Sequence, residues 1–311
     1  MELFNPNTKF PFMATRKVWY AVSAILIIGS LASLAIRGLN LGVDFTGGVT
    51  IEAAFPGSPS LDAIRTGLTR LGYSEPQVQN FGSSRDVAIR LPPPGKLTGE
   101  QVRGQVEGVL RAIDPKVELR RVEVVGPQVG KELRTSAIWS LFFTMFLIAI
   151  YVGIRFHNFR LPTGAVLAAF HDPIIVLGFF SITGMVFDLS VVAAILAVIG
   201  YSLNDTVVVF DRIRERFEAN RRLAPEAVLD QSINQTMSRT IMTSWTTLIV
   251  VIVLLLLGGP VLQGFSTALV IGIIVGTYSS IYIASSVALD MGLKAEDIFP
   301  VSIRKAVDEM P

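Results

Sequence analysis

The sequence has 311 residues, of which 51% are hydrophobic and only 17% are charged, a balance that excludes an ordinary soluble domain and indicates a membrane protein. The net charge of +2 is too small to indicate nucleic-acid binding, so no nucleic-acid partner is expected. The absence of cysteine excludes disulfides and thiolate metal sites, and two histidines leave little material for an imidazole metal site.

Six apolar stretches are each long enough to cross a hydrocarbon core as a helix of about 20 residues. They are predicted at residues 18–36, 137–154, 163–182, 189–210, 240–257 and 262–289. Lys and Arg cluster before the first stretch, between the second and third, and after the fourth, whereas the connections 184–188 and 258–263 contain neither. Because basic loops stay in the cytoplasm, both termini, residues 1–17 and 291–311, are predicted to be cytoplasmic.

The first membrane helix, residues 18–37, is predicted to be an uncleaved anchor, because its apolar run is longer than the core of a signal peptide. Residues 38–134 must then lie outside the cytoplasm, since long loops cross a membrane regardless of their charge. The other five helices are expected within residues 135–290, with a cytoplasmic loop at about 211–238.

The exported region is predicted to fold as a small α+β domain. Strands are expected at 49–55, 77–81, 86–91 and 116–125, with a turn at 82–84 and with helices after the caps Ser60 and Thr98. This order, βαββαβ, is typical of a ferredoxin-like fold. The region contains no histidine, nucleophile elbow or phosphate loop, so a role in binding or assembly is expected and the chain is not expected to be an enzyme.

Two adjacent polar residues, His171 and Asp172, lie near the middle of the third predicted span. Pro173 follows them and removes a backbone donor, as is expected where a helix lines a cavity or meets a polar neighbour. The pair therefore has two interpretations, a place on a proton path or a packing pair that hydrogen-bonds to neighbouring spans.

Asp205 lies within the fourth predicted span, where an acid costs roughly 3 kcal/mol on insertion scales and is by default a functional-site hypothesis. Arg239 begins the fifth span. Because the two spans are consecutive and antiparallel, the two charges should lie at a similar depth and form a pair. The alternatives are an Asp205 that hydrates near the helix end and an Arg239 that only anchors its span in the cytoplasm.

Glycines mark one face of the sixth predicted span. Gly264, Gly272 and Gly276 are separated by multiples of four residues, so they fall on one side of a helix. Small residues let two helices approach closely in a membrane. This face is therefore expected to meet another helix, in this chain or in a partner.

Five segments together carry a family signature. Residues 42–48 and 200–215 are the most specific, and segments 125–130, 169–172 and 234–240 accompany them in the same order. The signature residues in the first two segments are Gly42, Asp44, Phe45, Gly47, Gly48, Gly200 and Asn204. Gly47 and Gly48 are expected to turn the chain into the first strand of the exported domain rather than to bind a ligand. The chain resembles, over about residues 14–290, the SecF members of the SecD/SecF family of protein-export membrane proteins, which belongs to the resistance-nodulation-division superfamily.

The resemblance implies a fold and a set of partners. A SecF protein contributes six membrane helices and one exported domain, which is half of the twelve-helix unit that it forms with SecD. The implied location is the bacterial cytoplasmic (inner) membrane. The implied partners are SecYEG, further candidates YajC and YidC, and unfolded preprotein as the substrate.

The resemblance also implies roles for the intramembrane charges. The proton gradient would drive late-stage translocation, with H+ as the coupling ion and no metal or other cofactor. Asp205 would carry the proton and Arg239 would be its charge partner. A place for Asp172 and His171 on the proton path is a further hypothesis, which rests on their depth in the third span.

Two other functions fit part of this sequence. A subunit of a proton-coupled exporter of small molecules would share the superfamily architecture, but it should carry twelve spans and two large exported domains. A non-transporting membrane assembly or insertion factor would use Asp205 only as a structural residue. Substitution of Asp205 tests whether this residue carries the proton. Deletion distinguishes the two transporters, because loss of an exporter predicts drug sensitivity, whereas loss of a protein-export subunit predicts accumulation of unprocessed secretory precursors.

Overall fold

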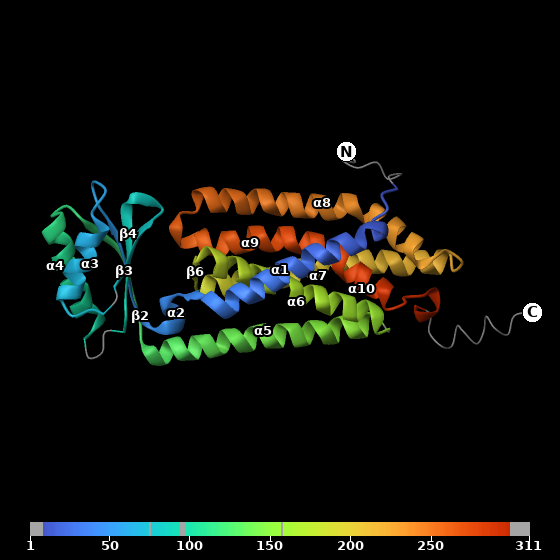
Figure 1. Cartoon of the computed structure of the whole chain (residues 1–311), viewed down its shortest axis with the longest axis horizontal. Coiled ribbons are helices and arrows are strands. Elements are labelled where there is room, and N and C mark those ends of the chain that lie inside the picture. The colour runs from blue at the N-terminus through green and yellow to red at the C-terminus, as the bar shows by residue number, and fades with distance from the viewer. Residues whose placement is uncertain (1–8, 75, 94–96, 157, 299–311) are drawn as a thin grey trace, which may run out of the picture.

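The protein forms two bodies, a bundle of long helices and a smaller α/β domain at one end of the bundle (Figure 1). The structure, a computed structural model, describes residues 9–74, 76–93, 97–156 and 158–298. Of the predicted cytoplasmic termini, residues 1–8 and 299–311 lie outside the described residues.

The helices of the bundle follow the predicted spans and extend beyond several of them. They are η1 (Met13–Thr15), α1 (Arg16–Arg37), α5 (Pro127–Arg155), α6 (Arg160–Thr183), α7 (Leu189–Ala219), α8 (Pro225–Leu257), α9 (Pro260–Ser279), the π-helix η2 (Ser280–Ala284), α10 (Ser285–Asp290) and η3 (Ala295–Asp297). Among the described residues, six helical segments are long and apolar enough to cross a membrane, the last of them made of α9, η2 and α10. The prediction of six spans is confirmed.

Three of the six segments form the centre of the bundle. α6, α7 and the last segment bury 56%, 50% and 56% of their most apolar stretch, whereas α1, α5 and α8 bury 11%, 11% and 17%. Phe180, Ile195 and Ala268 from the three central helices share one core. The outer helices expose rows of aliphatic and aromatic side chains, a surface suited to lipid or to another membrane chain.

The loop predicted at about 211–238 is mostly helical. α7 continues to Ala219 and α8 begins at Pro225, so only residues 220–224 lie between the two helices. Ion pairs one turn apart, such as Arg214 with Glu218 at 3.2 Å, stabilise the extension of α7 beyond the apolar span.

The α/β domain, residues 48–125, has the predicted ferredoxin-like order. Its elements are β2 (Gly48–Ala54), α3 (Leu61–Arg70), β3 (Gln77–Phe81), β4 (Ser83–Leu91), α4 (Gly99–Ile113) and β5 (Glu118–Val125). The strands form one antiparallel sheet in the order β3-β4-β2-β5. Ser60 and Thr98 cap α3 and α4 as predicted. β4 begins earlier than predicted, because Gly82, with a φ of 80°, brings Phe81 opposite Ser83 without a longer turn.

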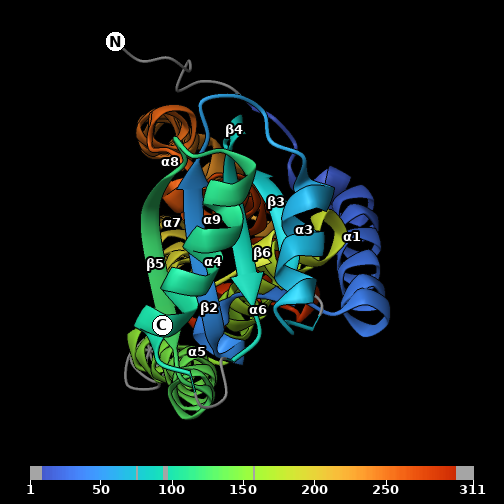
Figure 2. The same ribbon diagram turned by 90° about the vertical axis from the view of Figure 1, so that its left-hand side faces the viewer.

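The two faces of this sheet have different surroundings. α3 and α4 cover the outer face (Figure 2), on which Val49, Ile51 and Ile89 are fully buried. The inner face is polar and looks towards the bundle across a cavity of about 480 Å³. The charged residues that line this cavity are Asp44, Glu52, Arg90, Arg121, Glu123 and Asp188.

The chain passes from the bundle into the α/β domain through a short, tightly packed segment. β1 (Asn40–Leu41) pairs in parallel with β6 (Val186–Phe187), which lies between α6 and α7, and α2 (Val43–Thr46) follows β1. Gly48 has a φ of 134°, and a Cβ atom at this position would lie 2.4 Å from the carbonyl oxygen of Leu91. With Gly47, whose φ is 71°, it turns the chain into β2 as predicted.

Candidate functional site

Asp205 lies on α7, the helix at the centre of the bundle. Its side chain is 3% exposed, and among the described residues its Oδ2 atom has no hydrogen-bond partner. Buried polar atoms in folded proteins are nearly always paired, so each exception calls for an explanation such as a water, an ion or a functional role. The structure therefore confirms that this acid is buried and leaves its carboxylate available.

The contact between α7 and α8 places a second unpaired group near this carboxylate. Tyr201 on α7 donates to Ser244 on α8 over 3.4 Å. Because the two helices are antiparallel, one turn further along each of them brings Asp205 level with Thr240. The Thr240 hydroxyl is also buried and, among the described residues, has no hydrogen-bond partner. The two unsatisfied polar groups thus share one level of the same helix contact.

Arg239, the predicted charge partner, precedes Thr240 on α8. Its side chain is exposed and interacts electrostatically with the Asp205 carboxylate. Among the described residues, no ion pair or hydrogen bond joins the two side chains. The structure brings Arg239 into electrostatic reach of Asp205 without a direct pair between the two side chains.

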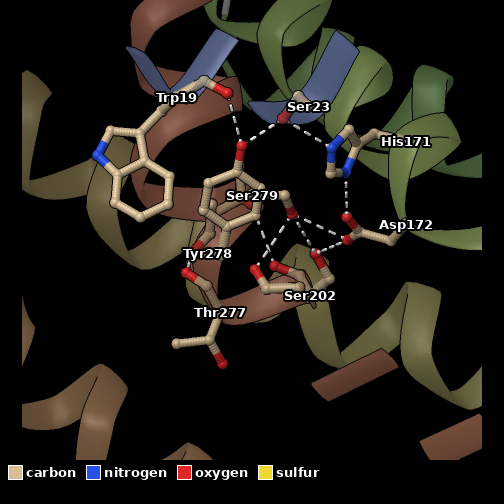
Figure 3. Close-up of polar contacts among 11 residues, drawn as sticks. Trp19, Ser23, His171, Asp172, Ser202, Thr277, Tyr278 and Ser279 are labelled. Carbon is tan, nitrogen blue, oxygen red and sulfur yellow. Dashed lines mark hydrogen bonds and ion pairs between the residues drawn. The ribbon is translucent and has the colours of Figure 1, made fainter. Parts of the chain in front are cut away.

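The second predicted pair, His171 and Asp172 on α6, forms the centre of a buried polar network (Figure 3). Asp172 is fully buried, and its Oδ2 atom accepts hydrogen bonds from Ser202 at 2.5 Å and from Ser279 at 3.0 Å. Its Oδ1 atom lies 2.9 Å from Nδ1 of His171. α7 and α9 thus hold the carboxylate on one side, and the imidazole holds it on the other.

The network continues from His171 to the first membrane helix. Nε2 of His171 lies 3.0 Å from the hydroxyl of Ser23 on α1, and this hydroxyl contacts the hydroxyl of Tyr278 on α9. Tyr278 donates to the backbone carbonyl of Trp19 at 2.9 Å. A single series of hydrogen bonds therefore joins all three central helices to α1 (Figure 3).

Glycines on α9 and an irregular helical segment create the space for this network. A Cβ atom at Gly276 would lie 2.9 Å from that of Ser202 and 3.5 Å from Oδ2 of Asp172, so only glycine allows α9 to approach α7 this closely. At Gly272 the added atom would lie 2.2 Å from a methyl group of Val198. The predicted close-packed glycine face thus meets α7 of the same chain. Directly after Ser279, the helix widens into the π-helix η2, a feature often found at functional sites.

The two acids occupy separate sites. Ser202, which binds Asp172, precedes Asp205 by one helical turn, and Thr206 donates to the backbone carbonyl of Ser202 at 3.1 Å. Among the described residues, the hydrogen bonds do not continue from Ser202 to the Asp205 side chain. α7 therefore carries one acid site itself and contributes a donor to the other.

The signature residues in the segment 42–48 occupy positions in the structure that the sequence did not predict. Asp44 accepts a hydrogen bond at 3.0 Å from the backbone N–H of Leu189, the first residue of α7, whose N-cap is Asp188. The ring of Phe45 stacks on that of Phe187 at 6.0 Å. A Cβ atom at Gly42 would lie 3.1 Å from that of Asp188, the residue that precedes α7. This segment thus holds the first turn of the helix that carries Asp205, at the end of the bundle next to the α/β domain.

Gly200 and Asn204 do not join either acid site. Gly200 has no atom within 4 Å of an added Cβ, and Asn204 is exposed on the surface of α7.

Sequence reasoning missed Ser23, Tyr278 and Ser279, three members of the network around Asp172. Their polar side chains in apolar spans were visible, but nothing in a local pattern pairs residues that lie more than a hundred positions apart.

Comparison with known proteins identifies two matching families. The family described as protein export membrane protein SecD/SecF, C-terminal, matches residues 105–294, and the SecD/SecF GG motif matches residues 32–55. The protein translocase subunit SecF of Vibrio alginolyticus is 47% identical and covers 100% of this chain and 99% of its own length. That of Escherichia coli O157:H7 is 43% identical and covers 100% and 97%.

A solved structure extends this similarity to three dimensions. The crystal structure of SecDF, a translocon-associated membrane protein from Thermus thermophilus, matches with a TM-score of 0.85 and 35% sequence identity. The match covers 93% of this chain but only 39% of the SecDF chain. SecDF in a super-membrane-facing form matches with a lower TM-score of 0.68 at 34% identity.

Proposed function

Because this chain belongs to the SecD/SecF family of protein-export membrane proteins, we propose that it works as the SecF subunit of a SecD/SecF complex and uses the proton gradient to promote late-stage protein translocation. Its apolar helices and its relatives make it a multi-pass membrane protein. The observation that carries the proposed proton coupling is Asp205, a buried carboxylate whose Oδ2 atom has no hydrogen-bond partner among the described residues.

SecD is the proposed membrane partner. The matched architecture continues beyond this chain, since the chain spans 39% of the SecDF structure. Gly200 and Asn204 are exposed on α7 and lie close to Asp205 in the sequence. This exposure supports a partner surface next to the carboxylate. SecYEG, YajC and YidC and an unfolded preprotein complete the proposed assembly. H+ is the proposed coupling ion, with no other cofactor and no enzymatic reaction.

The proposed location is the bacterial inner membrane, with both termini in the cytoplasm. The arginine-rich end of α7, which includes Arg212 and Arg216, lies at the opposite end of the bundle from the α/β domain (Figure 1). Basic segments stay in the cytoplasm, so this separation supports an exported α/β domain.

In the proposed cycle, the position of Arg239 controls the charge on Asp205. A guanidinium remains charged even when it is partly buried, so its approach stabilises the carboxylate and its withdrawal favours the neutral acid. A movement between α7 and α8 that changes this separation would therefore bind or release one proton. The same movement would be transmitted through Asp44 and β6 to the entrance of the α/β domain.

The test is Asp205→Asn in the SecD/SecF complex, with translocation measured in membrane vesicles in the presence and absence of a proton gradient. We expect the gradient-dependent part of translocation to fall at least tenfold, since the amide has the shape of the acid but cannot exchange a proton. The control is Asp211→Asn on the same helix, where the carboxylate pairs with Arg155 at 2.6 Å. If Asp205→Asn assembles with SecD and keeps its gradient-dependent export, the proposal is wrong.

A further inference from the structure

We propose that His171 and Asp172 form a second proton-binding site, separate from Asp205, whose occupancy sets the number of hydrogen bonds that hold α1 to the centre of the bundle. The inference deepens the proposed function by adding a second proton site to the cycle. Only its use in export depends on that function, because the proposed site itself is argued from the hydrogen bonds of the network in Figure 3.

The network has a fully bonded state with a fixed proton arrangement. The Trp19 carbonyl can only accept, so Tyr278 must donate to it. The hydroxyl of Ser23 must then donate to the oxygen of Tyr278, and Nε2 of His171 must donate to Ser23. The remaining contact, between His171 and Asp172, needs one further proton. The pair is therefore either an imidazolium with a carboxylate or an imidazole with a carboxylic acid.

The loss of one proton leaves one of these four contacts without a hydrogen. The contact between His171 and Asp172 is the most costly to break, since two acceptors, one of them charged, would then face each other at 2.9 Å in a buried site. The three remaining contacts are those of Trp19 with Tyr278, of Ser23 with Tyr278, and of Ser23 with His171. Each of the three includes a residue of α1, so α1 loses a hydrogen bond in every arrangement that keeps the histidine and aspartate bonded.

The other two hydrogen bonds to the Asp172 carboxylate do not change when this proton is lost. Ser202 and Ser279 both donate to Oδ2 of Asp172, whichever charge the pair carries, because a carboxylic acid protonated at Oδ1 keeps Oδ2 as an acceptor. The response to the proton is thus directed along the other branch, from Oδ1 through the imidazole to α1. Asp172 and His171 are held at 0% and 3% exposure, so bulk water does not screen the contact.

Other titratable groups near the site are few among the described residues. The elements packed around it carry Tyr278 on α9 and Tyr282 on η2, and α7 carries Asp205, one turn beyond Ser202, and Tyr201, which donates to Ser244 on α8. Tyr20 on α1 interacts with Asp290 and Arg16 at the end of the bundle that is remote from the α/β domain. The experiment must therefore separate the pair from Asp205.

The order serine, histidine, aspartate is also that of a hydrolase triad, and the structure disfavours that use. Ser23 is 4% exposed, and its hydroxyl contacts both the imidazole and Tyr278. A substrate carbonyl would have to displace the tyrosine from the centre of the bundle to reach the serine. A proton, in contrast, can bind to the pair without displacing a side chain.

α1 is a suitable element to receive such a signal. It lies on the outside of the bundle, and its last residue, Arg37, is followed directly by β1, α2 and the central strand β2 of the α/β domain (Figure 1). Below that junction it is held to α6 by the close approach of Ser30 to Gly178 and by a hydrogen bond of 2.8 Å between Ser33 and Ser181. A change at Trp19 and Ser23 therefore acts on the opposite half of a helix that is fixed near the α/β domain.

Trp19 provides a direct optical test. Its indole ring stacks on Tyr282 at 4.6 Å and lies 5.2 Å from Tyr278, so its emission responds to the position of α1. The other two tryptophans, Trp139 and Trp245, are exposed on the outer helices and can be replaced by phenylalanine. The full-length chain with Trp19 alone, in lipid nanodiscs, is titrated with acid and base. We expect a single pH-dependent shift in Trp19 emission.

Four variants in this background decide the assignment. Ser23→Ala removes the link between the imidazole and Tyr278 and should abolish the shift, although the Tyr278 contact with Trp19 remains. Asp172→Asn should abolish it as well. Ser33→Ala, the control on the same helix, should keep the shift, and so should Asp205→Asn. Absence of a shift in the parent chain, its persistence in Ser23→Ala, or its loss in Asp205→Asn would overturn the proposal. Export by the Asp205 variant is measured separately, so the two proposals fail independently.

Discussion

Three carboxylates in this protein are removed from water to different degrees and are stabilised in different ways. Asp172 is fully buried and its oxygens contact three side chains. Oδ2 of Asp205 is also buried but has no hydrogen bond among the described residues. Glu52 is only half-buried in the cavity below the sheet, with Arg121 at 3.9 Å. A carboxylate with few partners and little water is the kind whose protonation changes most easily.

Glu52 gives a prediction at neutral and acidic pH. Burial raises the pKa of Glu52 above its ordinary value, and the nearby Arg121 offsets this only in part. Because the folded protein disfavours the charged form, the residue costs no stability below the pKa of the unfolded chain and costs stability once the pH exceeds the raised pKa. Glu52→Gln should therefore raise the Tm of the full-length chain by a few degrees at pH 7 and leave it unchanged at about pH 4.

Circular dichroism or calorimetry at both pH values measures this effect. Glu118→Gln on β5 is the matched control, because that side chain is exposed and its substitution should not change the Tm at either pH. An equal rise of the Tm at both pH values for Glu52→Gln would contradict the explanation by charge, since only the charged form is affected.

At the scale of helices and strands, local sequence patterns predicted the elements and their caps, but they did not predict the contacts between helices in the interior. The caps Ser60 and Thr98, the six apolar segments and the glycine face of α9 all depend on residues close in sequence, and the structure confirms them. The partners of His171 and Asp172 come from three other helices. Their pairing depends on which helices meet and at what rotation, and no local periodicity contains that information.

The same reason explains what was missed at Asp205 and in the signature segment. The similar depth of Asp205 and Arg239 followed from their consecutive helices, but the absence of a direct pair depends on the rotation of α8. The glycines at positions 47 and 48 were correctly predicted to turn the chain. The hydrogen bond from the first residue of α7 to Asp44 was not predicted, because it joins residues 145 positions apart.

The contact between α7 and α9 gives a prediction for Gly276. Gly276→Ala would place a methyl group 2.9 Å from the Cβ atom of Ser202, so the helices must separate and the hydrogen bonds to Asp172 lengthen. Overpacking of this kind costs about 1–3 kcal/mol, and the Tm of the full-length chain should fall by several degrees. Thermal unfolding in detergent measures the change. Gly153→Ala on α5, where no atom lies within 4 Å, should leave the Tm unchanged or slightly higher. Equal behaviour of the two variants would refute the close contact.

At the scale of the whole molecule, the bundle and the α/β domain are connected where α7 begins. Asp44 belongs to the segment that enters the α/β domain, yet its carboxylate accepts the hydrogen bond of Leu189 in the bundle. β1 and β6 make a second connection at the same place. Movements of α7 and of the α/β domain are therefore linked at this junction and not through the large cavity between the two bodies.

Asp44→Ala tests this link. Asp188, the N-cap of α7, stays in place, so only the hydrogen bond from Leu189 is lost. Its loss should cost about 1 kcal/mol and should speed hydrogen exchange in the first turn of α7 about fivefold, while exchange in α3 and α4 stays the same. Asp44→Asn keeps an acceptor at this position and should remain close to the parent protein. Hydrogen exchange measured by mass spectrometry on the full-length chain resolves these segments. Equally slow exchange in Asp44→Ala would show that this hydrogen bond does not hold the first turn of α7.

The π-helix η2 has a consequence for changes of chain length. A short π-helix contains one residue more than the α-helical segment that would hold its two ends in the same orientation. Here it lies between Tyr278 and Ser279 on one side and Ser285, whose hydroxyl donates to the carbonyl of Ser280, on the other. Deletion of one residue between 280 and 284 would leave a regular helix in which both sides of the segment keep their present faces. Deletion of one residue from α9 would instead rotate one side of the helix by about 100° relative to the other, so the two sides could not both keep their partners. The last span is therefore expected to tolerate the loss of a residue better within η2 than within α9.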